Sequence, residues 1–195
     1  MSTRPVPDRQ LWLLVGGNGA GKSTFPRLFL APHGLPFVNA DDLARLLDPQ
    51  APEARAEEAA KIADQQRETL LLKGLSFCFE TVYSHPAKVD FTARAKALGY
   101  EVILVLIHLG DAELNQARIS QRVAAGGHAV PADKVISRIP RLLEHVKTAL
   151  PLCDLVTLID NASADNPFRP VATIRRGLVE RHQDPLPSWA EALLN

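Results

Sequence analysis

The run GGNGAGKS at residues 16–23 constrains the fold and chemistry of this chain more than any other feature. It matches G-x-x-x-x-G-K-[ST], a glycine-rich loop whose backbone N–H groups surround a chain of phosphates. Lys22 is placed to reach the β- and γ-phosphates, and Ser23 to ligate Mg²⁺. The alternative is a glycine-rich turn without a ligand. The apolar residues 11–15 before the loop and the helix-compatible residues 24–30 after it favour the phosphate loop, because strand, loop and helix are its usual context.

Strand-like and helix-like segments alternate along the chain, which predicts a mostly parallel sheet covered on both faces. We therefore expect a P-loop NTPase fold of the three-layer α/β/α type, with about five strands in one domain over residues 1–195. The predicted strands are 11–16, 36–40, 76–81, 101–109, 155–160 and 171–175. The predicted helices are 41–47, 53–73, 86–98, 111–125, 132–150 and 188–194.

Three details of these helices are predicted as well. Asp111 is expected to be the N-cap of the helix 111–125, and Ser188 the N-cap of the helix 188–194. Pro140 is expected to kink or split the stretch 132–150, because a helix-interior proline removes a hydrogen bond. The apolar spacing of that stretch predicts a core stripe of Ile136, Ile139, Leu143 and Val146.

The composition excludes several classes of protein. The formal net charge is zero, which disfavours nucleic acid as a partner because a basic surface is lacking. No long apolar stretch indicates a signal peptide or a membrane span, so we expect a cytoplasmic protein without a membrane partner. Two cysteines, Cys78 and Cys153, are too few for a disulfide framework and are expected to be reduced and buried.

Two carboxylates follow predicted strands, at the edge of the sheet where ligands bind in α/β folds. Asp41 follows the strand 36–40 and suits either the acceptance of a proton from a substrate hydroxyl or the N-cap of the next helix. Glu80 ends the strand 76–81 and suits a substrate hydroxyl or metal-bound water, or else an exposed strand end. The spacing alone does not decide between these roles.

Basic residues flank a glycine-containing break at residues 126–131. Such residues can close over phosphates and neutralise developing charge, or they can be ordinary surface charges. We expect a lid over about residues 118–141, whose candidates are Arg118, Arg122, His128, Arg138 and Arg141. Asn161 follows the strand 155–160 and is expected either to touch the nucleotide base or to cap a turn.

Taken together, these segments resemble the zeta toxin family of small-molecule kinases, in particular its short free-standing bacterial branch. The matching strings run in order over nearly the whole chain: GGNGAGKSTF at 16–25, PFVNADDLAR at 36–45, SFCFET at 76–81, GYEV at 99–102, ARISQRV at 117–123, GGHAVP at 126–131, and Asp160 with Asn161. The ordered combination is more specific than the phosphate loop alone.

The resemblance implies an ATP-dependent kinase that phosphorylates a hydroxyl of a sugar nucleotide, with UDP-N-acetylglucosamine as the acceptor. It implies that Asp41 is the catalytic base, that Lys22 and Arg122 stabilise the transferring phosphate, and that Ser23 holds the metal. Glu80, Thr81 and Tyr83 are expected to join Asp41 in binding the acceptor. The expected ATP-binding residues are Gly16, Gly17, Asn18, Gly19, Ala20, Gly21, Lys22, Ser23, Thr24 and Asn161.

The chain departs from the family pattern at two positions. Val82 stands where well-studied members carry a hydroxyl, so Thr81, Tyr83 or Ser84 would have to replace it. His128 stands where they carry a second clamping arginine, so Arg138 or Arg141 would supply the charge. Two alternatives therefore stay open: a kinase of another metabolite or nucleotide cofactor, and a regulatory module that binds or hydrolyses ATP without an acceptor. An antitoxin partner is known in the family but is not readable from this sequence.

Overall fold

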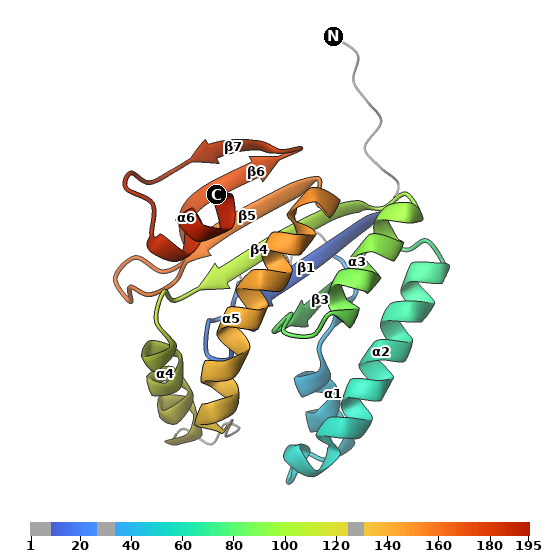
Figure 1. Cartoon of the computed structure of the whole chain (residues 1–195). Coiled ribbons are helices and arrows are strands. Elements are labelled where there is room, and N and C mark those ends of the chain that lie inside the picture. The colour runs from blue at the N-terminus through green and yellow to red at the C-terminus, as the bar shows by residue number, and fades with distance from the viewer. Residues whose placement is uncertain (1–8, 27–33, 125–130) are drawn as a thin grey trace.

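A mostly parallel sheet organises the molecule. A computed structural model of the chain describes residues 9–26, 34–124 and 131–195. Within these ranges, seven strands form one sheet in the order β2-β3-β1-β4-β5-β6-β7, with helices packed against it (Figure 1). The strands are β1 (Gln10–Gly16), β2 (Phe37–Val38), β3 (Phe77–Thr81), β4 (Glu101–His108), β5 (Leu155–Asp160), β6 (Arg169–Arg175) and β7 (Leu178–Arg181).

Strands β2, β3, β1, β4 and β5 are parallel, whereas β6 and β7 extend the sheet as antiparallel strands. The mostly parallel sheet is as predicted. It has two strands more than the expected number of about five: β6 corresponds to the predicted strand 171–175, and β7 was not predicted. The predicted strand 36–40 is paired over only two residues, Phe37 and Val38, because the helix that follows begins already at Ala40.

The helices agree closely with the predicted ranges. They are α1 (Ala40–Leu47), α2 (Ala56–Leu72), α3 (Ala87–Ala97), α4 (Ala112–Ala124), α5 (Ala132–Ala149) and α6 (Ser188–Leu194), with short 3₁₀ turns at Pro52–Arg55 and Leu150–Leu152. The side chain of Asp111 accepts a hydrogen bond from the Glu113 N–H, so its predicted capping role is confirmed. The predicted helix 24–30 lies mostly outside the described residues.

Two helix predictions need correction. Helix α5 continues through Pro140, so the stretch is not split there. Of the predicted core stripe, Ile139 and Val146 are buried and Leu143 packs against the core, whereas Ile136 is half exposed. In α6 the N-cap is Pro187 rather than Ser188. Ser188 is the first residue of the helix, and no side chain makes a capping hydrogen bond there.

Alternate side chains of the strands build two cores. On one face, Leu13 of β1 lies between Phe79 of β3 and Leu104 of β4, and α2, α3, α5 and α6 cover this face. On the other face, Leu14 joins Cys78, Ile107 and residues around Phe25 in a smaller core. Successive residues of the apolar strands therefore contribute side chains to opposite faces of the sheet, and both faces are buried.

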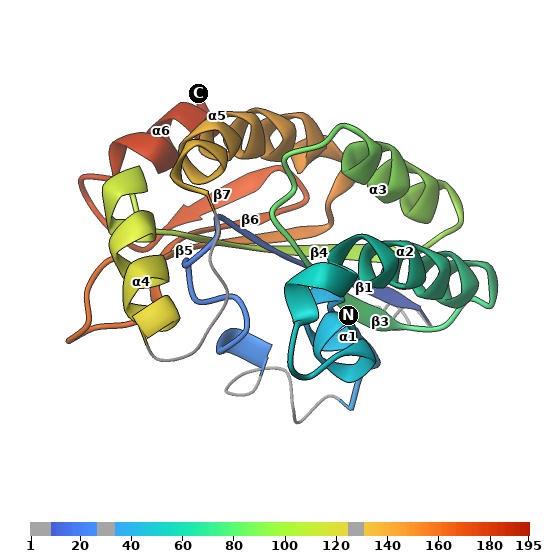
Figure 2. The ribbon, with the colours of Figure 1, turned by 90° about the horizontal axis from the view of Figure 1, so that it is seen from below.

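Strand β1 lies in the middle of the parallel part of the sheet, and the chain adds β2 and β3 on one side of it and β4 and β5 on the other. Ligands of open α/β sheets bind at the carboxyl ends of strands beside such a change of direction. Figure 2 shows α1 and α2 on one side of the loop that follows β1, and α4 on the other. The fold thus places the glycine-rich loop between two groups of helices.

Both cysteines are free and buried, as predicted. Burial raises the pKa of each thiol to about 12, so neither is a thiolate near neutral pH. In the ranges that the structure describes, no helix is both long and apolar enough to cross a membrane.

Candidate active site

The glycine-rich loop leaves the end of β1 in a conformation that side chains would disrupt. A Cβ atom on Gly16 would lie 2.4 Å from the Ile107 carbonyl oxygen, so β1 and β4 can approach here only without one. Gly21 has φ of +101°, and a Cβ there would lie 2.5 Å from Nδ2 of Asn161. The N–H groups of Thr24 and Phe25 then bond to the Gly21 carbonyl, which starts a helical turn directly after the loop.

Two asparagine side chains hold the loop through hydrogen bonds to its carbonyl groups. Asn161 is buried, and its Nδ2 donates to the Ala20 carbonyl at 2.8 Å while its Oδ1 accepts from the Phe168 N–H at 3.0 Å. Asn115 of α4 donates from Nδ2 to the Asn18 carbonyl at 2.6 Å. Asn161 therefore supports the loop through its side chain. Asn115 is a second supporting residue, and no motif in the sequence points to it.

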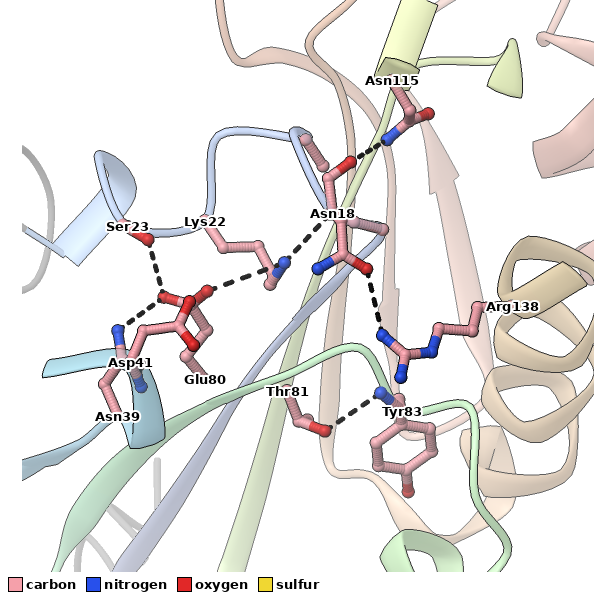
Figure 3. A network of polar contacts seen from close by, with 12 residues as sticks. Asn18, Lys22, Ser23, Asn39, Asp41, Glu80, Thr81, Tyr83, Asn115 and Arg138 are labelled. Carbon is pink, nitrogen blue, oxygen red and sulfur yellow. Dashed lines mark hydrogen bonds and ion pairs between the residues drawn. The ribbon is translucent and has the colours of Figure 1, made fainter. Parts of the chain in front are cut away.

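Glu80 connects the loop with the neighbouring strand. Its side chain is only 10% exposed, and Oε1 lies 3.6 Å from Nζ of Lys22. Its Oε2 accepts hydrogen bonds from Ser23 and from Asn39, each at 3.1 Å. Figure 3 shows these side chains converging on the carboxylate. Glu80 is therefore not an exposed strand end but the centre of a polar network.

Asp41 is free of the capping role that the sequence left open. Asn39 is the N-cap of α1, and its Oδ1 accepts from the Asp41 N–H at 2.9 Å. Asp41 lies in the first turn, and its exposed carboxylate is beside Glu80 (Figure 3). Its neighbour Asp42 is also exposed and is paired with Arg45 on the outer side of the helix.

Two adjoining cavities meet at these residues. The first, which we call the loop cavity, has a volume of about 180 Å³ and is lined by loop residues, Asp41, Glu80 and Arg118. The second, which we call the side cavity, has a volume of about 270 Å³ and extends between the loop and α2. Both cavities are lined by Asn18, Lys22, Asp41 and Glu80. One molecule in each cavity would therefore meet the other beside Lys22 and Asp41.

The side cavity has a wall that the sequence did not reveal. Asp64 and Arg67 of α2 and Lys88 of α3 line it. Arg67 is almost fully buried and lies over the Phe79 ring, 4.9 Å from its centre. Burial lowers the pKa of Arg67 to about 10, and burial together with the charge of Arg67 lowers the pKa of Lys88 to about 8. Nothing in the local sequence of these residues distinguishes them from surface charges.

The predicted lid residues occupy different positions. Arg138 lines the side cavity, and its Nη1 lies 3.5 Å from Oδ1 of Asn18. Arg118 lines the loop cavity and donates to the Ala162 carbonyl. Arg141 instead donates to the Ser137 carbonyl on its own helix. Arg122 is a residue of α4 whose side chain lies outside the described part of the structure, as does all of His128.

Of the hydroxyls predicted to bind substrate, the structure places Thr81 in the side cavity but not Tyr83. The Tyr83 ring is buried and points away from Glu80 (Figure 3). Its hydroxyl lies 2.8 Å from that of Thr92, and burial raises its pKa above the usual range. Tyr83 lines neither of the two cavities, because the backbone turns at this residue with φ of +62° and the ring is buried in the core.

The site contains oxygen donors that suit Mg²⁺. The Ser23 hydroxyl and the Glu80 carboxylate are in contact beside the loop, and Mg²⁺ commonly takes one or two protein oxygens and completes its shell with phosphates and water. Among the described residues, no group of three or more His, Cys, Asp or Glu side chains is placed to hold a metal ion by itself.

Comparison with known proteins gives one family and one similar sequence. A family model described as an AAA domain matches residues 11–144. A protein of Haemophilus influenzae, described as uncharacterized, is 29% identical over 134 residues, which cover 65% of this chain and 95% of that protein.

Several solved structures are similar in fold. A chain of the AvrRxo1-ORF1:-ORF2 complex with ATP superposes with a TM-score of 0.75 and 18% identity, covering 96% of this chain. The PezAT toxin–antitoxin system of Streptococcus pneumoniae gives 0.63 and 17%, covering 87% of this chain and 73% of that one. The Pnkp1/Rnl/Hen1 RNA repair complex gives 0.57 and 20%, covering 90% and 50%. This chain spans only 64% of the AvrRxo1 complex chain that it matches.

Proposed function

The chain belongs to this AAA domain family and has a P-loop kinase-like α/β fold, and on that premise we propose that it is an ATP-dependent small-molecule kinase. In the proposed reaction, an acceptor hydroxyl attacks the γ-phosphorus of ATP. The new O–P bond forms as the bond to the β,γ-bridging oxygen breaks, ADP leaves, and the hydroxyl proton passes to Asp41.

The observation that carries this proposal is that Lys22 and Asp41 line both cavities. A triphosphate in the loop cavity and an alcohol in the side cavity would meet between a cation and a carboxylate. Positioning and electrostatic stabilisation supply most of the catalysis of phosphoryl transfer, and a carboxylate that accepts the hydroxyl proton is a recurring part of such sites.

The other residues support the phosphates in this proposal. Lys22 and Ser23 both contact Glu80. With ATP bound, Lys22 would hold the β- and γ-phosphates and Ser23 would hold Mg²⁺. A bound Mg²⁺ ion neutralises charge on the phosphate oxygens. Arg118 and Arg138 already line the cavities, and we propose that Arg122 joins them from a lid formed by about residues 118–141.

The acceptor is proposed to be a sugar nucleotide, with UDP-N-acetylglucosamine as the first candidate. The zeta toxin-like motifs of the sequence support this choice, and the likeness of the fold to the PezAT system is consistent with it. An antitoxin-like protein that binds near the ATP site is a further proposal, supported by the same likeness. Thr81 is the proposed hydroxyl contact of the acceptor, since it lines the side cavity.

The test is consumption of Mg²⁺-ATP with and without UDP-N-acetylglucosamine and a panel of other alcohols, followed by mass analysis of the products. A phosphorylated acceptor, formed at a rate that saturates with acceptor concentration, is expected. ATP hydrolysis that no acceptor changes would instead favour a regulatory ATP-binding module. Failure to bind ATP at all would remove the basis of the proposal.

A further inference from the structure

The wall of the side cavity formed by α2 and α3 carries two cations, Arg67 and Lys88, and one carboxylate, Asp64. At its far wall, Asp64 is the shared partner of two cations: it is paired with Arg67, and Oδ1 lies 3.2 Å from Nζ of Lys88. Asp64 is itself mostly exposed, whereas Arg67 is buried and Lys88 is only 24% exposed. Two partly desolvated cations therefore face the cavity with one solvated carboxylate between them.

Such an arrangement is costly without a ligand. Removal of a charge from water is unfavourable unless an opposite charge compensates for it. The lowered pKa values of Arg67 and Lys88 express the same cost, since burial disfavours both charges and the charge of Arg67 also lowers the pKa of Lys88. An anion in the side cavity would relieve this repulsion and gain charge-assisted hydrogen bonds.

The two cations also lie on the acceptor side of the site, away from the loop. Arg67 and Lys88 line the side cavity but not the loop cavity, whereas Asp41 lines both. A molecule whose hydroxyl lies at Asp41 therefore extends toward Arg67 and Lys88. The phosphates of ATP, which the loop holds, occupy the other cavity and do not compete for these two residues.

We propose that Arg67 and Lys88 bind an anionic group of the acceptor, a phosphate or diphosphate, and so select charged alcohols over neutral ones. This inference rests on the proposed kinase function and adds the residues that would recognise the anionic group of the acceptor. Arg67, held over Phe79 and by Asp64, gives a fixed guanidinium plane, and Lys88 gives a mobile charge at the start of α3.

Inorganic phosphate is the first probe, because its binding does not depend on the identity of the acceptor. The full chain is loaded with Mg²⁺ and a non-hydrolysable ATP analogue, so that the loop is filled, and phosphate is titrated while backbone amide NMR signals are followed. Saturable shifts are expected around residues 64–67 and 81–88. Lys88→Gln is expected to weaken binding at least ten-fold, and Lys88→Arg to restore most of it.

The matched control is Lys61→Gln, an exposed lysine of the same helix α2 that pairs with Glu57 and lines neither cavity. It is expected to leave phosphate binding unchanged. Because Arg67→Gln removes the ion pair with Asp64 and the guanidinium that packs over Phe79, it can destabilise the fold, and its effect is interpreted only alongside the Lys88 variants. Phosphate shifts that are absent, or equal in wild type and Lys88→Gln, would overturn the inference.

A kinetic experiment separates this inference from the proposed function. UDP-N-acetylglucosamine, N-acetylglucosamine 1-phosphate and uncharged N-acetylglucosamine are compared as acceptors. The uncharged sugar is expected to have a KM at least ten-fold higher, and Lys88→Gln to raise KM for the charged acceptors with little change in kcat. Phosphorylation with equal KM for charged and uncharged sugars would refute the anion subsite alone. No phosphorylated product from any acceptor, with phosphate binding intact, would count against the kinase function instead.

Discussion

At the level of single residues, the two carboxylates of the site have different tasks. Glu80 already contacts Lys22, Ser23 and Asn39, so its charge organises the loop. The carboxylate of Asp41 has no hydrogen-bond or ion-pair partner among the described residues, and Asn39 has taken the capping role beside it. A carboxylate with open lone pairs at the junction of two cavities is suited to accept a proton.

The first prediction concerns this carboxylate. Asp41→Asn is expected to leave ATP affinity within about two-fold and to lower kcat by about 10²- to 10⁴-fold, which is the usual range for loss of a general base. The matched control is Asp42→Asn, because Asp42 is exposed and paired with Arg45 away from the cavities. Calorimetry with the ATP analogue and steady-state rates measure the two effects. Equal rates for Asp41→Asn and wild type would exclude Asp41 from proton transfer.

A second prediction separates two arginines of α5. Arg138→Gln is expected to lower kcat about 10²-fold, as removal of a group that stabilises transition-state charge commonly does. Arg141→Gln is expected to change it less than two-fold, because Arg141 bonds to Ser137 rather than to the loop. Steady-state kinetics at saturating ATP measure both variants. If the two substitutions had the same effect, the proposed role of Arg138 would be wrong.

At the level of elements, the turn from β1 into the following helix depends on Gly21. Gly21→Ala is expected to abolish measurable ATP binding, because the new Cβ meets Asn161 and the backbone has φ of +101°. The control is Gly177→Ala, since Gly177 also has a positive φ, +81°, but has open space around it. That variant should lose about 1–2 kcal/mol of stability and keep its ATP affinity. Calorimetry and urea denaturation test both.

The element boundaries show what the sequence could predict. Apolar runs were sufficient to predict the strands β1, β3, β4 and β5. A glycine stop predicted the C-terminal end of α3, where Gly99 has φ of +82°. The stripe of α5 was shifted because Ile136 and Val135 are both apolar, and only packing against the sheet selects Val135. Strand β7 has no buried residue, so its sequence carries no alternation that could reveal it.

At the level of the whole molecule, the candidate site was predictable only where its residues lie at the ends of predicted strands. The loop, Asp41 and Glu80 lie at strand ends, and parallel strands bring their carboxyl ends together. The wall formed by Asp64, Arg67 and Lys88 joins two helices, and its composition depends on how α2 and α3 pack over β3. No local pattern encodes that packing, which is why this part of the site became visible only in the structure.

The C-terminal helix α6 packs against the carboxyl end of β4. His108, the last residue of β4, is 3% exposed and lies edge-to-face against Trp189 of α6, with ring centres 4.9 Å apart. The His108 carbonyl accepts from the N–H of Asn161, the residue that also holds the loop. Burial lowers the pKa of His108 to about 4, although Asp160 acts weakly in the opposite direction. The imidazole is therefore neutral in the folded protein at ordinary pH.

This buried histidine predicts the pH dependence of stability. Above its ordinary pKa of 6.5 neither state binds the proton; below it, the unfolded chain binds a proton that the folded protein excludes until about pH 4. The free energy of unfolding should thus fall by about 2 kcal/mol between pH 7 and pH 5. Urea denaturation at pH 7, 6 and 5 measures it. His108→Phe should remove most of this decrease, whereas His85→Gln, at an exposed position, should retain it. An equally steep decrease in His108→Phe would assign the acid sensitivity to other groups.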